Sequence, residues 1–229
     1  MLTSFAPDLW IADGPPVIAY AGFHYPLRMA VIQLADGSLL LWSPIPLTDE
    51  LRNEVDTLGT VCHIIAPNSL HHLSIPDWKA AYPQAKLYAA PGLAKKRKDI
   101  SFDAELGDTP PPVWANEIDQ VLLENTITSE VVFFHKASGT AIFTDILQQF
   151  SPGWFSGWRG IVAKLDLMVS PEPSVPRKFR AGFRKKDEAR KAVRRILDWP
   201  TEKVVLAHGA PVTSDGRAFL ARAFQWLKV

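Results

Sequence analysis

Short apolar runs separated by turn residues dominate the hydrophobic pattern of this chain and predict a protein rich in β-strands. The runs that predict strands lie at residues 9–12, 27–34, 38–42, 62–66, 86–90, 118–123, 130–135, 140–144 and 203–207. Asp36-Gly37 joins the second and third of these runs, and such a pair is the strongest short signal for a hairpin. The run at 62–66 contains no acidic, lysine or arginine side chain, which is typical of a strand buried on both faces.

Helical periodicity is limited to a few segments. Thr48 can cap a helix over 49–58, and apolar residues recur at helical spacing over 187–198 and 214–227. A short helix is predicted over 77–82. We expect the three longer helices to bury one face each against the sheets. No linker or internal repeat interrupts the pattern, so residues 1–229 are expected to form one domain.

Residues 146–182 fit neither periodicity. This irregular insert is rich in aromatic side chains, with Trp154, Phe155, Trp158 and Phe179 among prolines and glycines. A loop of this length inside a compact domain is usually functional or disordered, and so many aromatics argue against disorder. Two interpretations remain open. The insert is either a capping subdomain that fills the flank of the sheets or a lid, with Trp154 and Trp158 as walls of a pocket.

Composition narrows the classes of function. With 47% hydrophobic and 21% charged residues, the chain has the composition of an ordinary globular protein. Its net charge of +1 gives no reason to expect binding to nucleic acid or to an anionic membrane. The single cysteine, Cys62, cannot form an internal disulfide, so a reducing, cytoplasmic setting is expected, and no signal peptide is apparent. Neither a Gly-x-Ser-x-Gly nucleophile motif nor a glycine-rich phosphate loop occurs.

Three predicted strands end in residue types that bind metals. The strand at 62–66 leads into His71-His72, the strand at 140–144 into Asp145, and the strand at 203–207 into His208. Packing these strands side by side would bring their ends together, and imidazole and carboxylate groups suit zinc, iron(II) or manganese. We therefore expect His72, Asp145 and His208 to converge on one divalent ion, most simply zinc, with His71 at the edge.

This order of elements resembles the metallo-β-lactamase superfamily. It is similar to a little-studied branch of unknown function in the stretches LRMAVIQLADGSLLLWSPIPL and APNSLHHLSIPDW. The resemblance implies an α+β fold, an αββα sandwich of two mixed β-sheets with outer helices. It also implies metal ligands on loops at one edge of the two packed sheets.

The first motif of that family, His-x-His-x-Asp-His, is degenerate here. If His71 and His72 take its last two places, the two earlier histidine places fall on Pro67 and Ser69, although Asn68 could take the first place in a register shifted by one. The middle histidine of the family is also missing from residues 125–129. The resemblance thus leaves the ligands of one metal site, with His71 where an aspartate would stand.

Two classes of function follow from this reduced set. The first is a metal-dependent hydrolase with a mononuclear site, in which the ion activates water for attack on a small ester, amide or thioester. The second is a catalytically silent relative that keeps the fold and binds a small ligand or a partner. The sequence gives no indication of the oligomeric state.

Overall fold

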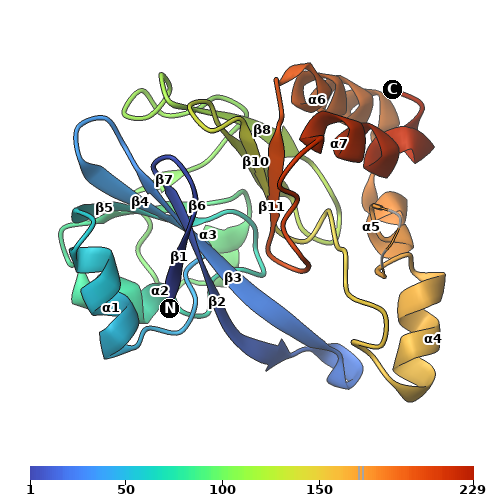
Figure 1. The fold of residues 1–229 in the computed structure, drawn as a ribbon, viewed down its shortest axis with the longest axis horizontal. Helices are drawn as coiled ribbons and strands as arrows, with labels where there is room; N and C mark the ends of the chain where they lie inside the picture. The colour runs from blue at the N-terminus through green and yellow to red at the C-terminus, as the bar shows by residue number, and fades with distance from the viewer. Residues whose placement is uncertain (170, 172) are drawn as a thin grey trace.

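Two mixed β-sheets pack face to face between outer helices in the computed structural model, which describes residues 1–169, 171 and 173–229 (Figure 1). The larger sheet has seven strands in the order β1-β2-β3-β4-β5-β6-β7. The smaller has four strands in the order β11-β10-β9-β8. The αββα sandwich of the metallo-β-lactamase type that the resemblance implies is therefore confirmed.

The larger sheet is antiparallel through its first four strands and parallel from β4 onward. Its strands are β1 (Leu2–Ala6), β2 (Leu9–Ile18), β3 (His24–Gln33), β4 (Ser38–Trp42), β5 (Thr60–Ala66), β6 (Lys86–Ala89) and β7 (Ala104–Glu105). The predicted hairpin joins β3 to β4, and Gly37 adopts the positive φ of +81° that its turn requires. Strand β2 continues through two prolines because its pairing with β3 shifts register between Gly14 and Val17, where their missing N–H groups are tolerated.

The smaller sheet carries two of the candidate ligands. Its strands are β8 (Ile118–Leu123), β9 (Glu130–His135), β10 (Thr140–Phe143) and β11 (Lys203–Leu206). Strands β10 and β11 pair in parallel, with Phe143 opposite Leu206. Their carboxyl ends therefore lie at the same edge of the sheet, which places the residues after Phe143 and after Leu206 close together.

Helices cover both outer faces of the sandwich (Figure 1). They are α1 (Asp49–Asp56), α2 (Ile75–Ala81), α3 (Leu93–Lys96), α4 (Gly157–Leu165), α5 (Arg177–Gly182), α6 (Lys186–Asp198) and α7 (Gly216–Phe224), with 3-10 turns η1 (Tyr20–Gly22) and η2 (Gln225–Leu227). Helices α1 and α2 share a buried cluster with the larger sheet, and α6 and α7 share one with the smaller sheet. The one-sided burial predicted for the three longer helices is confirmed.

The interior between the two sheets explains why the strands read as continuous apolar runs. Ile32 and Leu40 of the larger sheet face a common core with Phe133 and Ile142 of the smaller one. The alternate positions, such as Val31 and Leu41, face the helices on the outside. Since both faces of these strands are covered, their sequences cannot alternate between apolar and polar residues.

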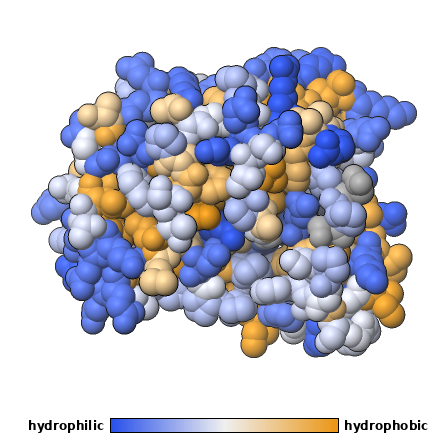
Figure 2. Space-filling model, viewed as in Figure 1, coloured by the Kyte–Doolittle hydropathy of each residue, from blue (hydrophilic) through white to orange (hydrophobic). Residues whose placement is uncertain are grey.

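The insert at 146–182 contains two short helices, α4 and α5, that the sequence did not predict. Phe150, Phe155, Ala163 and Met168 form a small buried cluster within it. Helix α4 exposes apolar side chains along its outer side, among them Ile161 at 63% of its surface, and Figure 2 shows apolar residues at that edge on the lower right. None of the helices in the described part of the chain has the length and apolar character needed to cross a membrane.

Candidate metal centre

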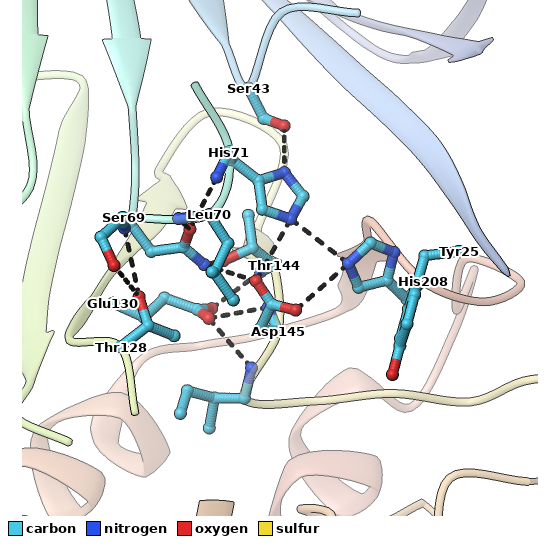
Figure 3. A network of polar contacts seen from close by, with 12 residues as sticks. Tyr25, Ser43, Ser69, Leu70, His71, Thr128, Glu130, Thr144, Asp145 and His208 are labelled. Atoms are coloured by element: carbon cyan, nitrogen blue, oxygen red, sulfur yellow. Dashed lines mark hydrogen bonds and ion pairs between the residues drawn. The ribbon is translucent and has the colours of Figure 1, made fainter. Parts of the chain in front are cut away.

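Three side chains that could bind a metal meet at one edge of the sandwich (Figure 3). His71 follows β5 of the larger sheet, while Asp145 and His208 follow β10 and β11 of the smaller one. The two Nε2 atoms of His71 and His208 are 3.2 Å apart. Nε2 of His71 lies 3.3 Å from Oδ2 of Asp145, and Nε2 of His208 lies 3.3 Å from Oδ1. These atoms converge from three distant segments, as the strand ends predict.

The surroundings of His208 fix its tautomer. Its Nδ1 atom lies 2.8 Å from the carbonyl oxygen of Pro26 on β3. Because a carbonyl can only accept, Nδ1 must carry the proton, and a neutral His208 then has an unprotonated Nε2. The lone pair on Nε2 points toward the carboxylate of Asp145. Two hydrogen-bond acceptors repel each other at this distance, so a proton or a cation has to lie between them.

Arg28 fixes the loop that carries His208. Its Nη1 atom donates to the carbonyl oxygens of Leu206 (2.6 Å) and Gly209 (2.5 Å), which flank the histidine. The guanidinium also pairs with Asp13, where Nε to Oδ1 is 2.7 Å. Arg28 thus joins β3 of the larger sheet to the chain that leaves β11.

Asn68 directs His71 toward the other two side chains. Its Oδ1 accepts from the backbone N–H groups of Leu70 (2.8 Å) and His71 (3.0 Å), which turns the chain back after β5. Its Nδ2 donates to Oδ2 of Asp145 and to Oγ1 of Thr144, each at 2.7 Å. On the other side of the ring, Nδ1 of His71 lies 2.7 Å from Oγ of Ser43.

Glu130 organises the Asp145 segment from beneath (Figure 3). The fully buried carboxylate accepts from the backbone N–H groups of Thr144 (2.7 Å), Asp145 (2.8 Å) and Ile146 (2.9 Å). Burial raises the pKa of Glu130, and the nearby charge of Asp145 adds to this, against the effect of the donors. Burial would also raise the pKa of Asp145, but His208 and His71, when their rings are protonated, donate to the carboxylate and hold its pKa well below its usual value.

His72 does not join this group, contrary to the expected convergence. Its Nδ1 atom lies 2.7 Å from Nη1 of Arg97, which can only donate, so His72 is neutral and Nδ1 accepts. Burial, together with the charges of Lys96 and Arg97, lowers the pKa of His72 to about 4. The structure therefore places His71 with Asp145 and His208 and makes His72 part of the loop's support. The reason is the turn at Asn68, which ends the extended geometry before the histidines.

The positions where the family has its other histidines, at Pro67, Ser69 and 125–129, do not supply a second set of ligands among the described residues. Ser69 bonds with Thr128, where the two hydroxyl oxygens are 3.0 Å apart. Within residues 1–169, 171 and 173–229, the group of His71, Asp145 and His208 is the one cluster of three potential ligands.

A divalent ion fits the three converging groups. Ligand atoms about 2.0–2.1 Å from a tetrahedral ion lie about 3.3 Å from one another. The two Nε2 atoms are 3.2 Å apart, and each lies 3.3 Å from one oxygen of Asp145, His71 from Oδ2 and His208 from Oδ1. The three side chains are only 4–7% exposed. An ion between them would also compensate the buried charge of Asp145 and take the lone pair of His208.

A cavity of about 340 Å³ opens beside the trio. Its wall is mainly apolar and includes Val17, Leu27, Ile45, Leu70, Leu73, Ile127 and Phe179, with Tyr25 and Lys178 as polar members. Trp154 and Trp158, which the lid interpretation makes walls of a pocket, are not among the described residues that line it. Trp154 instead donates from Nε1 to the carbonyl oxygen of His24 at 3.0 Å, and Trp158 packs against Phe23.

Comparisons with known proteins show which solved structures have a similar fold. Residues 8–154 match the model of a family described as a domain of unknown function, DUF4336. No curated protein matches the chain. The structure of DIM-1 metallo-β-lactamase exposed to ceftazidime aligns with a TM-score of 0.67 at 14% identity, covering 100% of this chain and 96% of that one. The mono-zinc form of FIM-1 metallo-β-lactamase from Pseudomonas aeruginosa aligns at 0.64 and 9% identity, covering 100% and 96%.

A flavodiiron core shares the same fold. The metal-soaked Flv1 flavodiiron core from Synechocystis sp. PCC6803 aligns with a TM-score of 0.65 at 12% identity, covering 100% of this chain and 60% of that one. At these identities the likeness concerns the fold alone, so the chemistry has to be argued from the residues present.

Proposed function

The chain belongs to the DUF4336 family of domains of unknown function, and from its metallo-β-lactamase fold and its trio of ligand-type residues we propose that it is a metal-dependent hydrolase. His71, Asp145 and His208 would hold one divalent ion. Zinc is the proposed ion, with iron or manganese as alternatives, because two imidazoles and a carboxylate suit all three. The proposed substrate is a small molecule with an ester, amide or thioester bond.

The tautomer of His208 is the observation that carries this proposal. The carbonyl of Pro26 holds a proton on Nδ1, so the neutral ring of His208 presents its unprotonated Nε2 to the Asp145 carboxylate, 3.3 Å away. A hydrogen bond from the ligand histidine to a backbone carbonyl is the usual way in which proteins orient imidazoles toward metals. His71 can donate from Nδ1 to Oγ of Ser43, which would free its own Nε2 in the same way.

The protein groups around the trio support hydrolytic chemistry. When bound there, a divalent ion supplies a Lewis acid that polarises a carbonyl group and makes water more acidic. His71, Asp145 and His208 would occupy three ligand positions on one side of the ion, and the cavity would lie on the other side. The apolar wall excludes bulk water from the reacting bond, and the network of Asn68 and Glu130 prevents Asp145 from turning away.

Metal titration tests the proposal directly. Chelator-treated protein should take up one equivalent of zinc, measured by competition with a chromophoric chelator and by elemental analysis. His208→Ala should abolish uptake, whereas the control His24→Ala, which changes a histidine outside the trio, should retain it. Hydrolysis of p-nitrophenyl esters and of thioesters should then follow metal occupancy. Equal zinc binding by wild type and His208→Ala would contradict the site.

A catalytically silent relative is the second candidate. The observation that favours it is that Nδ2 of Asn68 already occupies Oδ2 of Asp145, at 2.7 Å, so the carboxylate has one oxygen engaged. In that case the cavity would bind a small ligand without turnover. A zinc-loaded protein that binds ligands yet hydrolyses none of the esters, amides or thioesters tested would support this reading.

We also propose a cytoplasmic location and no role in binding nucleic acid. Cys62 is the single cysteine of the chain and is half-buried, which suits a reducing compartment. The net charge of +1 provides no electrostatic attraction to a polyanion. Fractionation of cells that produce the protein, with detection by antibody, would reveal a different compartment.

A further inference from the structure

The mouth of the cavity exposes large aliphatic side chains. Leu70 is 43% exposed, Leu73 is 60% exposed and Ile127 is 48% exposed. All three line the cavity beside the trio, and Leu70 and Leu73 flank the two histidines in sequence. Exposed apolar side chains that converge on a concave site indicate a ligand that covers them. The ligand of this cavity should therefore have an apolar part.

Among the described residues, one ammonium group lines the same cavity, that of Lys178 on α5. Its Nζ atom lies 3.1 Å from the hydroxyl oxygen of Tyr25 and 3.6 Å from Oδ2 of Asp166. It also lies over the rings of Tyr25 and Phe179, 5.5 and 5.3 Å from their centroids. The side chain of Lys178 is 35% exposed. The hydroxyl of Tyr25 and the rings of Tyr25 and Phe179 nevertheless restrict the position of its ammonium group.

Tyr25 connects this ammonium group to the trio. Its ring packs edge-on against the ring of His208, with centroids 5.2 Å apart, and Figure 3 shows it standing beside that histidine. The tyrosine oxygen accepts from Lys178, so its own proton remains available as a donor. Besides the tyrosine oxygen, the ammonium group approaches Oδ2 of Asp166 at 3.6 Å and Sδ of Met168 at 3.9 Å. Because a thioether sulfur is a weak acceptor, an anion can take its place as the partner of Lys178.

We propose that Lys178 and Tyr25 form an anion-binding subsite and that the substrate is an amphipathic anion, with an apolar body and one negatively charged group. This inference rests on the proposed function for the position of the scissile bond, which must lie next to the trio. The apolar body lies against Leu70, Leu73 and Ile127, and the charged group bonds with Lys178 and the hydroxyl of Tyr25. The cavity of about 340 Å³ is at the small end of ligand sites, which suits a single short chain.

Octanesulfonate is the probe for this subsite, and 1-octanol is its neutral counterpart. Both present eight carbons, but only the sulfonate offers charged oxygens, and sulfonates are poor ligands for zinc. Binding is measured by isothermal titration calorimetry on chelator-treated and on zinc-loaded protein. Lys178→Met should weaken octanesulfonate binding about tenfold or more and leave 1-octanol binding unchanged, the effect of losing one charge-assisted hydrogen bond. Lys178→Arg should retain most of the affinity.

Two further variants keep the test decisive. Tyr25→Phe preserves the ring packing and removes the hydroxyl, so it should weaken octanesulfonate binding by a few-fold even if Lys178→Met folds poorly. Lys185→Met is the matched control, since Lys185 also pairs with acidic side chains but does not line the cavity. It should bind octanesulfonate as the wild type does.

The outcomes separate this inference from the proposed function. Equal octanesulfonate affinity in wild type and Lys178→Met would overturn the subsite. Binding that requires zinc and is lost in His208→Ala but not in Lys178→Met would place the anion on the metal, which overturns the subsite while the metal site stands. Octanesulfonate binding that depends on Lys178 in a protein that takes up no zinc would support the subsite and reject the hydrolase.

Discussion

Replacing Arg28 by methionine should destabilise the protein and the candidate site together. The substitution keeps an unbranched apolar stem but removes the donors to the carbonyl oxygens of Leu206 and Gly209. A hydrogen bond to a charged donor contributes about 1.5–3 kcal/mol when it is buried. We take about 2 kcal/mol for the buried bond to Leu206 and about 1 kcal/mol for the half-buried bond to Gly209. The pair with Asp13 adds little, because that side chain is 65% exposed.

The free energy of unfolding of Arg28→Met should therefore fall by about 3 kcal/mol, or about 6–12 °C in melting temperature for a chain of this size. Urea denaturation followed by circular dichroism measures the first, and calorimetry measures the second. Zinc affinity should also fall about 10- to 100-fold, since the carbonyls that flank His208 lose their anchor. Asp13→Asn is the control and should cost less than about 1 kcal/mol. If the two variants shifted the urea midpoint equally, the role assigned to the carbonyls would be refuted.

Two other predictions follow from the supports of the site. The pKa of His72 is about 4 in the folded state and about 6.5 in the unfolded state, so the unfolded state binds more protons between these two pH values. The free energy of unfolding should therefore drop, by at most about 3 kcal/mol, as the pH falls from about 6.5 to about 4. His72→Gln, which still offers Arg97 an acceptor, should flatten this loss in urea titrations of metal-free protein, and an unchanged pH profile would contradict it. Gly209→Ala should cost about 1–3 kcal/mol, since φ is +149° and a Cβ would collide with the carbonyl oxygen of Gln149. Thermal melts at equal metal load check this, and a melting temperature like that of wild type would exclude the collision.

The sandwich could be predicted because its strands are buried on both faces. Each then appears in the sequence as a short apolar run between turn residues, and the run at 38–42 coincides with β4 (Ser38–Trp42). The edge strand β1 (Leu2–Ala6) was missed, since LTSFA buries only Ala6 completely and carries no apolar period. The end of β2 was missed because Pro15 and Pro16 argue against a strand until the register shift is known.

The sequence predicted which strand ends form the candidate site, but it did not predict which side chains point into it. His71 and His72 are adjacent, and the choice between them depends on how the chain leaves β5. The side chain of Asn68 makes that choice through two backbone hydrogen bonds. An asparagine after a strand predicts a turn, but it does not predict which of the two histidines the turn directs inward. Glu130 was missed for a similar reason. A glutamate that begins an apolar strand looks solvent-facing until the pairing of β9 with β10 places it under the Asp145 segment.

The three ligand-type residues are distributed over both layers of the sandwich. His71 extends from the larger sheet, whereas Asp145 and His208 extend from the smaller one. An ion bound by all three side chains would therefore cross-link the two sheets. Any ion that binds only the folded chain raises its stability by mass action, by about 4 kcal/mol at a free concentration a thousand times the dissociation constant. Loss of the ion would loosen the contact between layers at this edge first. Amide hydrogen exchange at the ends of β5, β10 and β11 would then become faster as the metal supply falls and slower as it recovers.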